Sequence, residues 1–223
     1  MEEEYINLDY KPINLFEPQK KLFKKLEESF SGNKNIFLYN VGLGNKNTTT
    51  KLFLSPSNEG ASASILKPSG HLKYHPEIIF EDTENIEVRS YDEFELNNVN
   101  FLNIDIQGYE LEALKGSENS LKKYIDYICI EISREEMYED AILKNQLDDY
   151  LKDFEFIRVS TRWASSDIPW GEAFYIKKIK VNTYKKILSV INKFFEGFKF
   201  YYLLIDPYRK FNSWKYKTKT VRN

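Results

Sequence analysis

The stretch FLNIDIQGYELEALKG, residues 101 to 116, constrains the fold of this chain more than any other feature. Its first residues favour a buried strand, and the strand runs directly into Asp105. Gly108 follows, and then a helix-like segment that is stopped by Gly116. A buried strand gains nothing from an unpaired terminal charge. Because ligands bind beyond the carboxyl ends of parallel strands, this unit predicts an α/β sheet with a site near Asp105.

Strands alternate with helices along the rest of the chain, which predicts a doubly wound sheet. Helices are expected to open at Glu17-Pro18, to cover 109–115, and to run through NQLDDYLKDF. The polar segment 45–75 is expected to form a long loop or an irregular excursion. The predicted strands cover 13–16, 35–44, 98–105 and 124–133, the segment 85–94 is expected to be a strand that enters a short helix, and a closing antiparallel pair covers 154–163 and 171–179.

The composition describes a folded globular protein, with 42% apolar and 30% charged residues. Residues 1–20 are acidic and polar, so they do not form a signal peptide. No uncharged apolar run approaches the roughly 20 residues that span a bilayer, and we therefore expect a cytoplasmic protein. The single cysteine, Cys129, excludes a disulfide framework and a thiolate metal site, and we expect it to be a buried structural thiol.

The charge is distributed unevenly between the body of the chain and its C-terminal end. Residues 177–223 hold 13 Lys or Arg and two acids, whereas the rest of the chain holds 19 basic and 32 acidic residues. From residue 181, aromatic and aliphatic residues recur at helical spacing with lysines between them. This pattern suits a helix on an anionic membrane surface, or a helix docked on the domain with a solvated basic face. Nucleic acid is not an expected partner, because no recognised binding module is present.

Three acids follow apolar runs at the ends of predicted strands: Glu17, Asp105 and Glu131. Consecutive parallel strands present their carboxyl ends on one side of a sheet, so the three acids are expected to share a cleft. Each has a purely structural alternative. Glu17 suits the N-terminal dipole of a helix, Asp105 suits a cap for the helix at Tyr109, and Glu131 suits a solvated strand end. Their occurrence together favours the site.

Several segments together resemble the FkbM-type methyltransferase family in order and spacing. The most specific is Asp-x-x-Gly-x-Glu-x-x-x-Leu-x-Gly, from Asp105 to Gly116, and the similarity extends over about residues 13 to 178. The resemblance implies a Rossmann-like class I methyltransferase sheet that binds S-adenosylmethionine. It also implies O-methylation of hydroxyl groups on sugars or polyketides. The other matching segments are FEP at 16–18, NVGLG at 40–44, ICIEIS at 128–133 and WGEAFYIKK at 170–178.

By position, the resemblance gives four residues to the cofactor, and the place of Gly108 between strand and helix adds a fifth. Glu17 would bind the cofactor ribose, and Asn40 and Val41 would lie beside the adenine. Asp105 would lie near the methyl donor, where a carboxylate meets a sulfonium cation with a favourable charge. Gly108 would let the backbone approach the ligand closely. The G-x-G at 42–44 is followed by polar residues instead of an apolar helix, so it is not a dinucleotide fingerprint.

The acceptor side is expected to use other residues. Asp105 would orient or deprotonate the acceptor hydroxyl, and Glu131 would help hold the acceptor or a divalent ion. His71 is a second candidate base, because the resemblance places its loop over the acceptor pocket, although a surface histidine without a role is an equal alternative. Trp163 and Trp170 are expected to form an aromatic lid over the core, with stacking on a sugar face as the other interpretation.

The family pattern places a strand, a glycine-rich turn and a helix before INLFEP. Here twelve residues without glycine precede Ile13, so we expect an N-terminally truncated sheet. The expected organisation is an acidic lead (1–12), a methyltransferase-like domain (13–180) and a basic, aromatic, helical C-terminal tail (181–223). The predicted function is S-adenosylmethionine-dependent O-methyl transfer to a glycan or metabolite hydroxyl. The alternative is an inactive FkbM-like domain that serves as a binding or membrane-peripheral protein.

Overall fold

The computed structural model describes residues 11–165, 167–181, 183 and 190. Most of the predicted acidic lead and basic extension therefore lies outside the described residues. In chain order the elements are β1 (Ile13–Phe16), α2 (Lys20–Ser29), β2 (Ile36–Tyr39), β3 (Gly42–Leu43), β4 (Thr48–Phe53), η1 (Pro56–Asn58), α3 (His71–Tyr74), β5 (Thr83–Arg89), η2 (Tyr91–Phe94), β6 (Phe101–Ile104), α4 (Glu110–Lys115), α5 (Glu118–Lys123), β7 (Tyr127–Ser133), α6 (Lys144–Asp153), β8 (Phe156–Trp163), β9 (Trp170–Lys177) and η3 (Lys178–Lys180).

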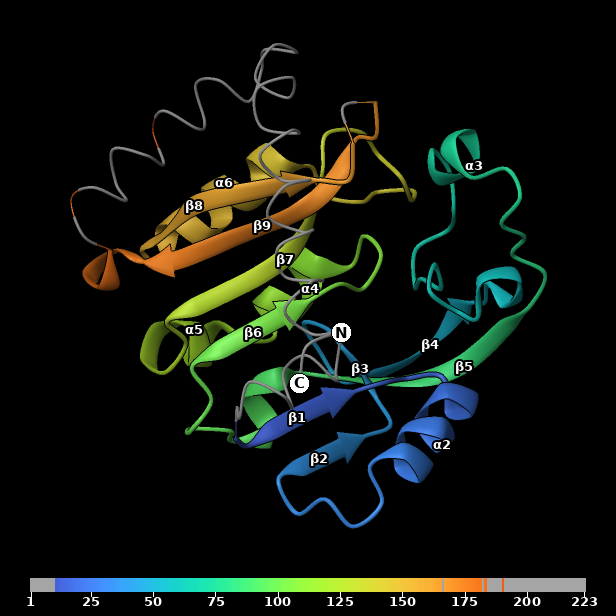
Figure 1. The fold of residues 1–223 in the computed structure, drawn as a ribbon, viewed down its shortest axis with the longest axis horizontal. Helices are drawn as coiled ribbons and strands as arrows, with labels where there is room; N and C mark the ends of the chain where they lie inside the picture. The colour runs from blue at the N-terminus through green and yellow to red at the C-terminus, as the bar shows by residue number, and fades with distance from the viewer. Residues whose placement is uncertain (1–10, 166, 182, 184–189, 191–223) are drawn as a thin grey trace, which may run out of the picture.

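The largest sheet has the strand order β6-β7-β9-β8. Strands β6 and β7 are parallel, and β9 runs antiparallel to both of its neighbours. Figure 1 shows helices α4, α5 and α6 together on the far face of this sheet. The parallel pair places the ends of β6 and β7 at one edge, where Asp105 and Glu131 were expected to meet.

Alternation along β7 separates the two faces of this sheet. Ile128, Ile130 and Ile132 are buried and pack with Leu114 of α4 and Leu147 of α6 in the main core. The intervening side chains of β7 belong to the opposite face and are only half-buried. One face of the sheet therefore forms the core, and the other is left for polar and charged groups.

Two smaller sheets complete the described fold: parallel β1-β2 and mixed β3-β5-β4. The Phe16 and Tyr39 rings are stacked with 4.7 Å between centroids, and Phe94 packs edge-on against both. Phe16 also contacts the main core. A mixed α/β fold is thus confirmed, but the described strands form three separately hydrogen-bonded sheets instead of one. The N-terminal truncation stays a prediction.

Two predictions about secondary structure are wrong. The segment 45–75 is not wholly a loop, because β4 pairs antiparallel with β5 from Thr48↔Val88 to Phe53↔Thr83. The strand predicted over 35–44 is divided into β2 and β3. The division falls at Asn40, whose amide donates to the carbonyl oxygens of Glu17 and Pro18 and so ties the chain to the preceding turn. The other predicted strands, the helix before Gly116 and the antiparallel pair β8-β9 are confirmed.

No helix within the described ranges is long and apolar enough to cross a membrane. The basic tail from residue 181 and its peripheral membrane contact therefore stay predictions, as does the cytoplasmic location.

Replacing Gly116 with alanine is expected to destabilise the fold by about 1–3 kcal/mol. A Cβ atom at this position would overlap the carbonyl oxygen of Gly44, and a backbone carbonyl cannot move aside as a flexible side chain does. Urea denaturation measures the free energy of unfolding. Gly42→Ala is the matched control, because its Cβ would meet Ile86 at 3.4 Å and Val88 at 3.5 Å, which are ordinary contacts. Equal losses in both variants would contradict this account of the close approach at Gly116.

Candidate functional site

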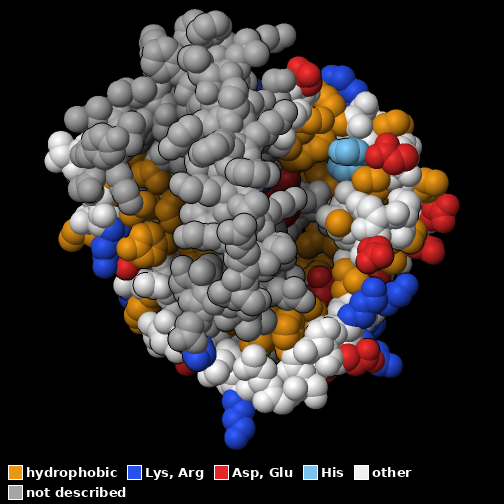
Figure 2. Space-filling view, viewed as in Figure 1, with side chains coloured by type: hydrophobic (Ala, Val, Ile, Leu, Met, Phe, Trp, Pro, Cys, Tyr) orange, Lys and Arg blue, Asp and Glu red, His pale blue; other side chains and the backbone are white. Residues whose placement is uncertain are grey.

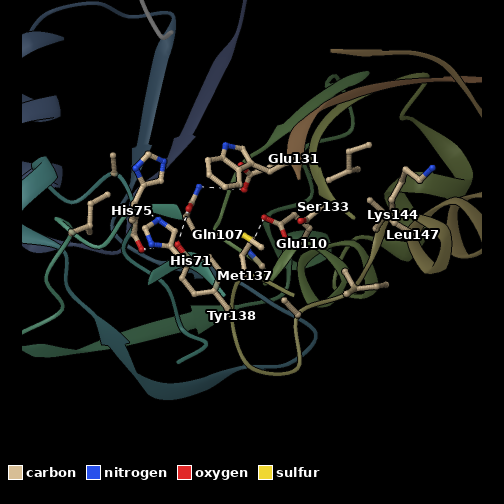
Figure 3. Close-up of a pocket in the computed structure, with 18 of the residues that line it drawn as sticks. His71, His75, Gln107, Glu110, Glu131, Ser133, Met137, Tyr138, Lys144 and Leu147 are labelled. Atoms are coloured by element: carbon tan, nitrogen blue, oxygen red, sulfur yellow. Dashed lines mark hydrogen bonds between the residues drawn. The ribbon is translucent and has the colours of Figure 1, made fainter. Parts of the chain in front are cut away.

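A cavity of about 290 Å³ lies beyond the carboxyl end of β7. Figure 2 shows acidic side chains inside a recess on this face, with a histidine at its rim. In Figure 3 the labelled histidines and Lys144 lie on opposite sides of the carboxylates. Residues from four separate segments line the cavity: Asn58, Ala61, Ser62, His71, His75 and Ile78; Gln107, Gly108 and Glu110; Glu131, Ile132, Ser133, Met137, Tyr138, Ala141, Ile142, Lys144 and Leu147; and Trp170.

The carboxylates of Asp105 and Glu131 are joined through the side chain of Gln107. The Gln107 Nε2 lies 2.7 Å from Asp105 Oδ1 and 3.3 Å from Glu131 Oε2, and it donates to both. On its other side, Gln107 Oε1 accepts a hydrogen bond of 2.8 Å from the Tyr138 hydroxyl. The structure thus brings together two of the three strand-end acids that the sequence singled out.

The turn between β6 and α4 is closed by Glu110. Its Oε1 accepts the backbone N–H groups of Ile106 and Gly108, both at 3.1 Å. Within the turn, Gln107 has φ +56° and Gly108 has φ +98°. The interpretation of Asp105 as the cap for this helix is therefore wrong, since Glu110 binds the backbone of the turn and the Asp105 carboxylate receives the Gln107 amide.

The acids in this region raise one another's pKa. Burial raises the pKa of Glu131 well above its ordinary value, and the charges of Asp105, Glu110 and Glu172 add to the effect. Burial also raises the pKa of Asp105, while the hydrogen bond from Gln107 opposes the shift. The Asp105 residue is nevertheless exposed to solvent, so water screens part of the repulsion there. Glu131 is thus the more strongly perturbed acid, and a solvated strand end does not describe it.

His71 lies in the cavity wall but directs neither ring nitrogen freely into it. Its Nε2 is 3.1 Å from Ser62 Oγ, and its Nδ1 is buried with no hydrogen-bond partner. Burial lowers the pKa of His71, the nearby His75 lowers it further, and Glu77 opposes the shift. The side chain is 6% exposed, so a surface histidine is not the correct description. Its role as a base stays a prediction.

Glu17, Asn40 and Val41 lie away from this cavity, at the carboxyl ends of β1 and β2. Glu17 Oε1 accepts the backbone N–H of Gln19 at 2.7 Å, just before α2 begins. Val41 is buried, and the Asn40 amide binds the turn that contains Glu17. The described structure therefore does not gather all three strand-end acids in one cavity. The cofactor roles of these residues stay predictions.

The remaining candidates divide between the cavity and the core. Trp170 lines the cavity, with its ring centroid 5.3 Å from that of His75. Trp163 is buried in the main core, with the Arg134 guanidinium 3.7 Å from its ring centroid. The two tryptophans thus do not form one lid. Gly108 lines the cavity, and a Cβ atom there would lie 3.1 Å from Ala141. The close packing and the left-handed backbone conformation therefore already require a glycine at this position.

Neither a metal nor a reactive thiol is indicated here. Within residues 11–165 and 167–181, no group of three or more His, Cys, Asp or Glu side chains is arranged to hold a metal ion. The divalent ion suggested for Glu131 therefore has no ligand set in that part of the chain. Cys129 is half-buried instead of buried, and burial raises its pKa to about 11, with smaller contributions from Glu172 and Asp105.

Three residues of the site have roles that the sequence does not reveal. Gln107 and Glu110 lie inside the motif that begins at Asp105, but only their contacts show what they do. Tyr138 lies 31 positions after Gln107, so no local pattern connects the two. A polar residue at positive φ beside a strand-end acid has no sequence signature by itself.

Stability is expected to fall as the pH rises from about 4.5 through about 7, and Glu110 is one of the buried acids that contribute to this fall. Burial raises the pKa of Glu110 from 4.5 to about 7. Between these values the folded protein holds a proton that the unfolded chain has lost, so deprotonation costs the fold about 1–3 kcal/mol. Urea midpoints measured across this pH range should decrease, and Glu110→Gln should flatten the decrease. The exposed Glu27→Gln on α2 is the control, and an identical profile for Glu110→Gln and wild type would contradict the assignment.

Enzymes with α/β folds bind their ligands beyond the carboxyl ends of parallel strands, and the acidic cavity lies at such a place. The fold and the site together therefore define the class of protein as an α/β enzyme. Residues 2–158 match the family model described as the methyltransferase FkbM domain, and the chain belongs to the FkbM methyltransferase family. A crystal structure of methyltransferase FkbM from Methylobacillus flagellatus KT is similar at 16% identity and a TM-score of 0.47, covering 74% of this chain and 36% of that chain. No curated protein matches the chain.

Proposed function

We propose that the chain transfers a methyl group from S-adenosylmethionine to a hydroxyl group of a sugar, glycan or related metabolite. The observation that carries the proposal is the pairing of Asp105 with Glu131 at the edge of a cavity that Glu131 lines. Methyl transfer to a hydroxyl requires alignment of three atoms and removal of one proton. Carboxylates with a raised pKa are suited to accept that proton near neutral pH.

The charge of the site supports the cofactor. The hydrogen-bond donor that Asp105 and Glu131 share is the neutral amide of Gln107. Burial raises the pKa of Glu131, and the charges of the surrounding acids raise it further. A sulfonium cation near these groups would balance their charge, with Asp105 and Glu131 at the methyl-donor end and Glu17 at the ribose. When bound, S-adenosylmethionine supplies the methyl group. We also infer that the parallel pairs β1-β2 and β6-β7 belong to a Rossmann-like methyltransferase sheet.

A second candidate function is binding without methyl transfer. The observation that favours it is that Glu17 and Asn40 already bind their own turn. At Gly44, a Cβ atom would lie 2.7 Å from Val88, so this glycine of the G-x-G serves internal packing. Such a protein would keep the acidic cavity for an acceptor-like ligand.

Calorimetric binding of S-adenosylhomocysteine to the full chain tests the proposed function. We expect micromolar affinity that weakens about tenfold or more in Glu17→Ala, because the ribose hydroxyls lose their acceptor. Asp105→Ala is expected to weaken binding as well, whereas the exposed Glu28→Ala on α2 should leave it unchanged. Absence of binding by a folded chain would overturn methyl transfer and favour the second candidate. Where binding is found, transfer of labelled methyl groups to a panel of hydroxyl-bearing glycans identifies the acceptor.

A further inference from the structure

Gln107 occupies a central place among the acids, and the proposed reaction has so far given it no task. An amide NH₂ group has two hydrogens and can donate to two acceptors at once. At Gln107 these acceptors are Asp105 Oδ1 at 2.7 Å and Glu131 Oε2 at 3.3 Å. Asp105 follows β6, and Glu131 lies on β7, so one side chain spans the ends of two neighbouring strands.

The orientation of this amide is fixed by Tyr138. The Tyr138 hydroxyl donates to Gln107 Oε1 at 2.8 Å, and the carbonyl oxygen of Ser62 lies 3.1 Å from the same hydroxyl. Tyr138 is 2% exposed, and burial raises its pKa, so it remains a protonated donor. A reversed amide would place its oxygen against two carboxylates and its NH₂ group against the tyrosine. The two carboxylates and the hydroxyl therefore together determine which end of Gln107 faces the acids.

The backbone of Gln107 is also held in an uncommon conformation. Its φ of +56° is rare for a residue other than glycine and persists only where the surroundings impose it. Glu110 imposes it through the N–H groups on both sides, those of Ile106 and Gly108. Ser64 Oγ adds a hydrogen bond of 2.7 Å to the Gln107 carbonyl oxygen. Several independent contacts thus direct this one side chain toward the acids.

We propose that Gln107 is a positioning residue that holds Asp105 and Glu131 as a pair in which at least one carboxylate stays ionised to accept the proton of an acceptor hydroxyl. The inference rests on the proposed methyl transfer. As the hydroxyl O–H bond breaks, the proton passes to a carboxylate oxygen and the acceptor oxygen bonds to the methyl carbon. The electron pair of the broken carbon–sulfur bond stays on sulfur, so the step is balanced.

The physical basis is a competition between two effects on the carboxylates. Burial and the charges of Glu110 on α4 and Glu172 on β9 favour the protonated form of Glu131, and Asp105 does the same from β6. A hydrogen bond donated to a carboxylate favours its charged form. The Gln107 amide provides this bond to both acids without adding a positive charge that would neutralise their basicity.

The test is a carbon-13 NMR titration of the side-chain carboxyl groups in wild type and Gln107→Met. Methionine keeps the length of the side chain and removes both donors. We expect the titration midpoints of the Asp105 and Glu131 pair to rise by about half a pH unit or more. Asp105→Asn and Glu131→Gln assign the resonances. A merely structural role would lower the stability of the variant without moving these midpoints.

Two further variants complete the experiment. Tyr138→Phe keeps the ring and removes the hydroxyl that orients the amide, so its midpoints should rise in the same direction by a smaller amount. If Gln107→Met does not fold, Tyr138→Phe still tests whether Gln107 positions the two acids. Gln146→Met is the control, since that amide accepts the Leu143 N–H at the start of α6. Its midpoints should match those of wild type.

The result that overturns the inference is a wild-type titration of Asp105 and Glu131 in a folded Gln107→Met or Tyr138→Phe variant. Binding of S-adenosylhomocysteine, measured in parallel, separates this inference from the proposed function. Unmoved midpoints in a chain that binds the cofactor analogue would reject the role of Gln107 alone. Raised midpoints in a chain that does not bind it would support the positioning by Gln107 and reject methyl transfer.

Discussion

Replacing Glu131 with glutamine is expected to lower the rate of methyl transfer by about 10²–10⁴, with little change in affinity for S-adenosylhomocysteine. Glutamine preserves the size of the side chain and can still accept a hydrogen bond from Gln107, but it cannot take up a proton from the acceptor. Glu131 is the acid that both lines the cavity and has a pKa raised well above its ordinary value, chiefly by burial. Loss of rate without loss of cofactor binding is the signature of a missing base.

The measurement is transfer of labelled methyl groups to the acceptor found with the wild-type chain, with calorimetry on the same preparations. Glu172→Gln is the matched control. Glu172 lies directly opposite Glu131 in the β7-β9 pair, is exposed, and stands outside the cavity lining. Its replacement removes one of the charges that raise the pKa of Glu131 and should affect the rate far less. An equal loss of rate in both variants would show that the rate depends on the total negative charge of the acids, and that Glu131 is not the base.

Replacing Arg158 with methionine is expected to reduce the free energy of unfolding by about 3–5 kcal/mol, the largest effect on stability predicted for this chain. Arg158 is 4% exposed and binds Asp148 with two hydrogen bonds, Nε to Oδ1 at 2.9 Å and Nη2 to Oδ2 at 3.0 Å. The Tyr175 hydroxyl donates to the same carboxylate at 2.9 Å, and Arg158 also donates to Thr161. The network joins α6 to β8 and β9, and methionine would leave the Asp148 charge without its principal partner.

Urea denaturation at neutral pH measures this loss. Arg162→Met is the matched control, because it makes the same substitution on the same strand. Arg162 is 78% exposed at its side chain and lies 3.9 Å from Glu172, so its ion pair should contribute less than about 1 kcal/mol. Similar losses in the two variants would indicate that arginine packing along β8, and not the buried pair, stabilises this part of the fold.

The sequence predicted those elements whose residues carry a local signal. β6 and α4 follow from an apolar run, a glycine and a helical stretch that stops at Gly116, and the β8-β9 pair follows from two strand-like segments around a short turn. It failed for β4, because the strand over 48–53 is mostly polar and is stabilised by pairing with β5, about 35 residues away. It also failed at Asn40, where a side chain bound to a distant turn ends a strand that periodicity alone would continue.

For the candidate site, the sequence by itself determined where the acids stand. Asp105 and Glu131 follow apolar runs, and two parallel strands must bring such ends to one edge. Only the tertiary structure decided that the amide of Gln107 joins them, that Tyr138 orients this amide, and that Glu17 lies elsewhere. The physical reason is that strand periodicity is local, whereas the positive φ of the turn and the approach of Tyr138 depend on packing between segments that are remote in sequence.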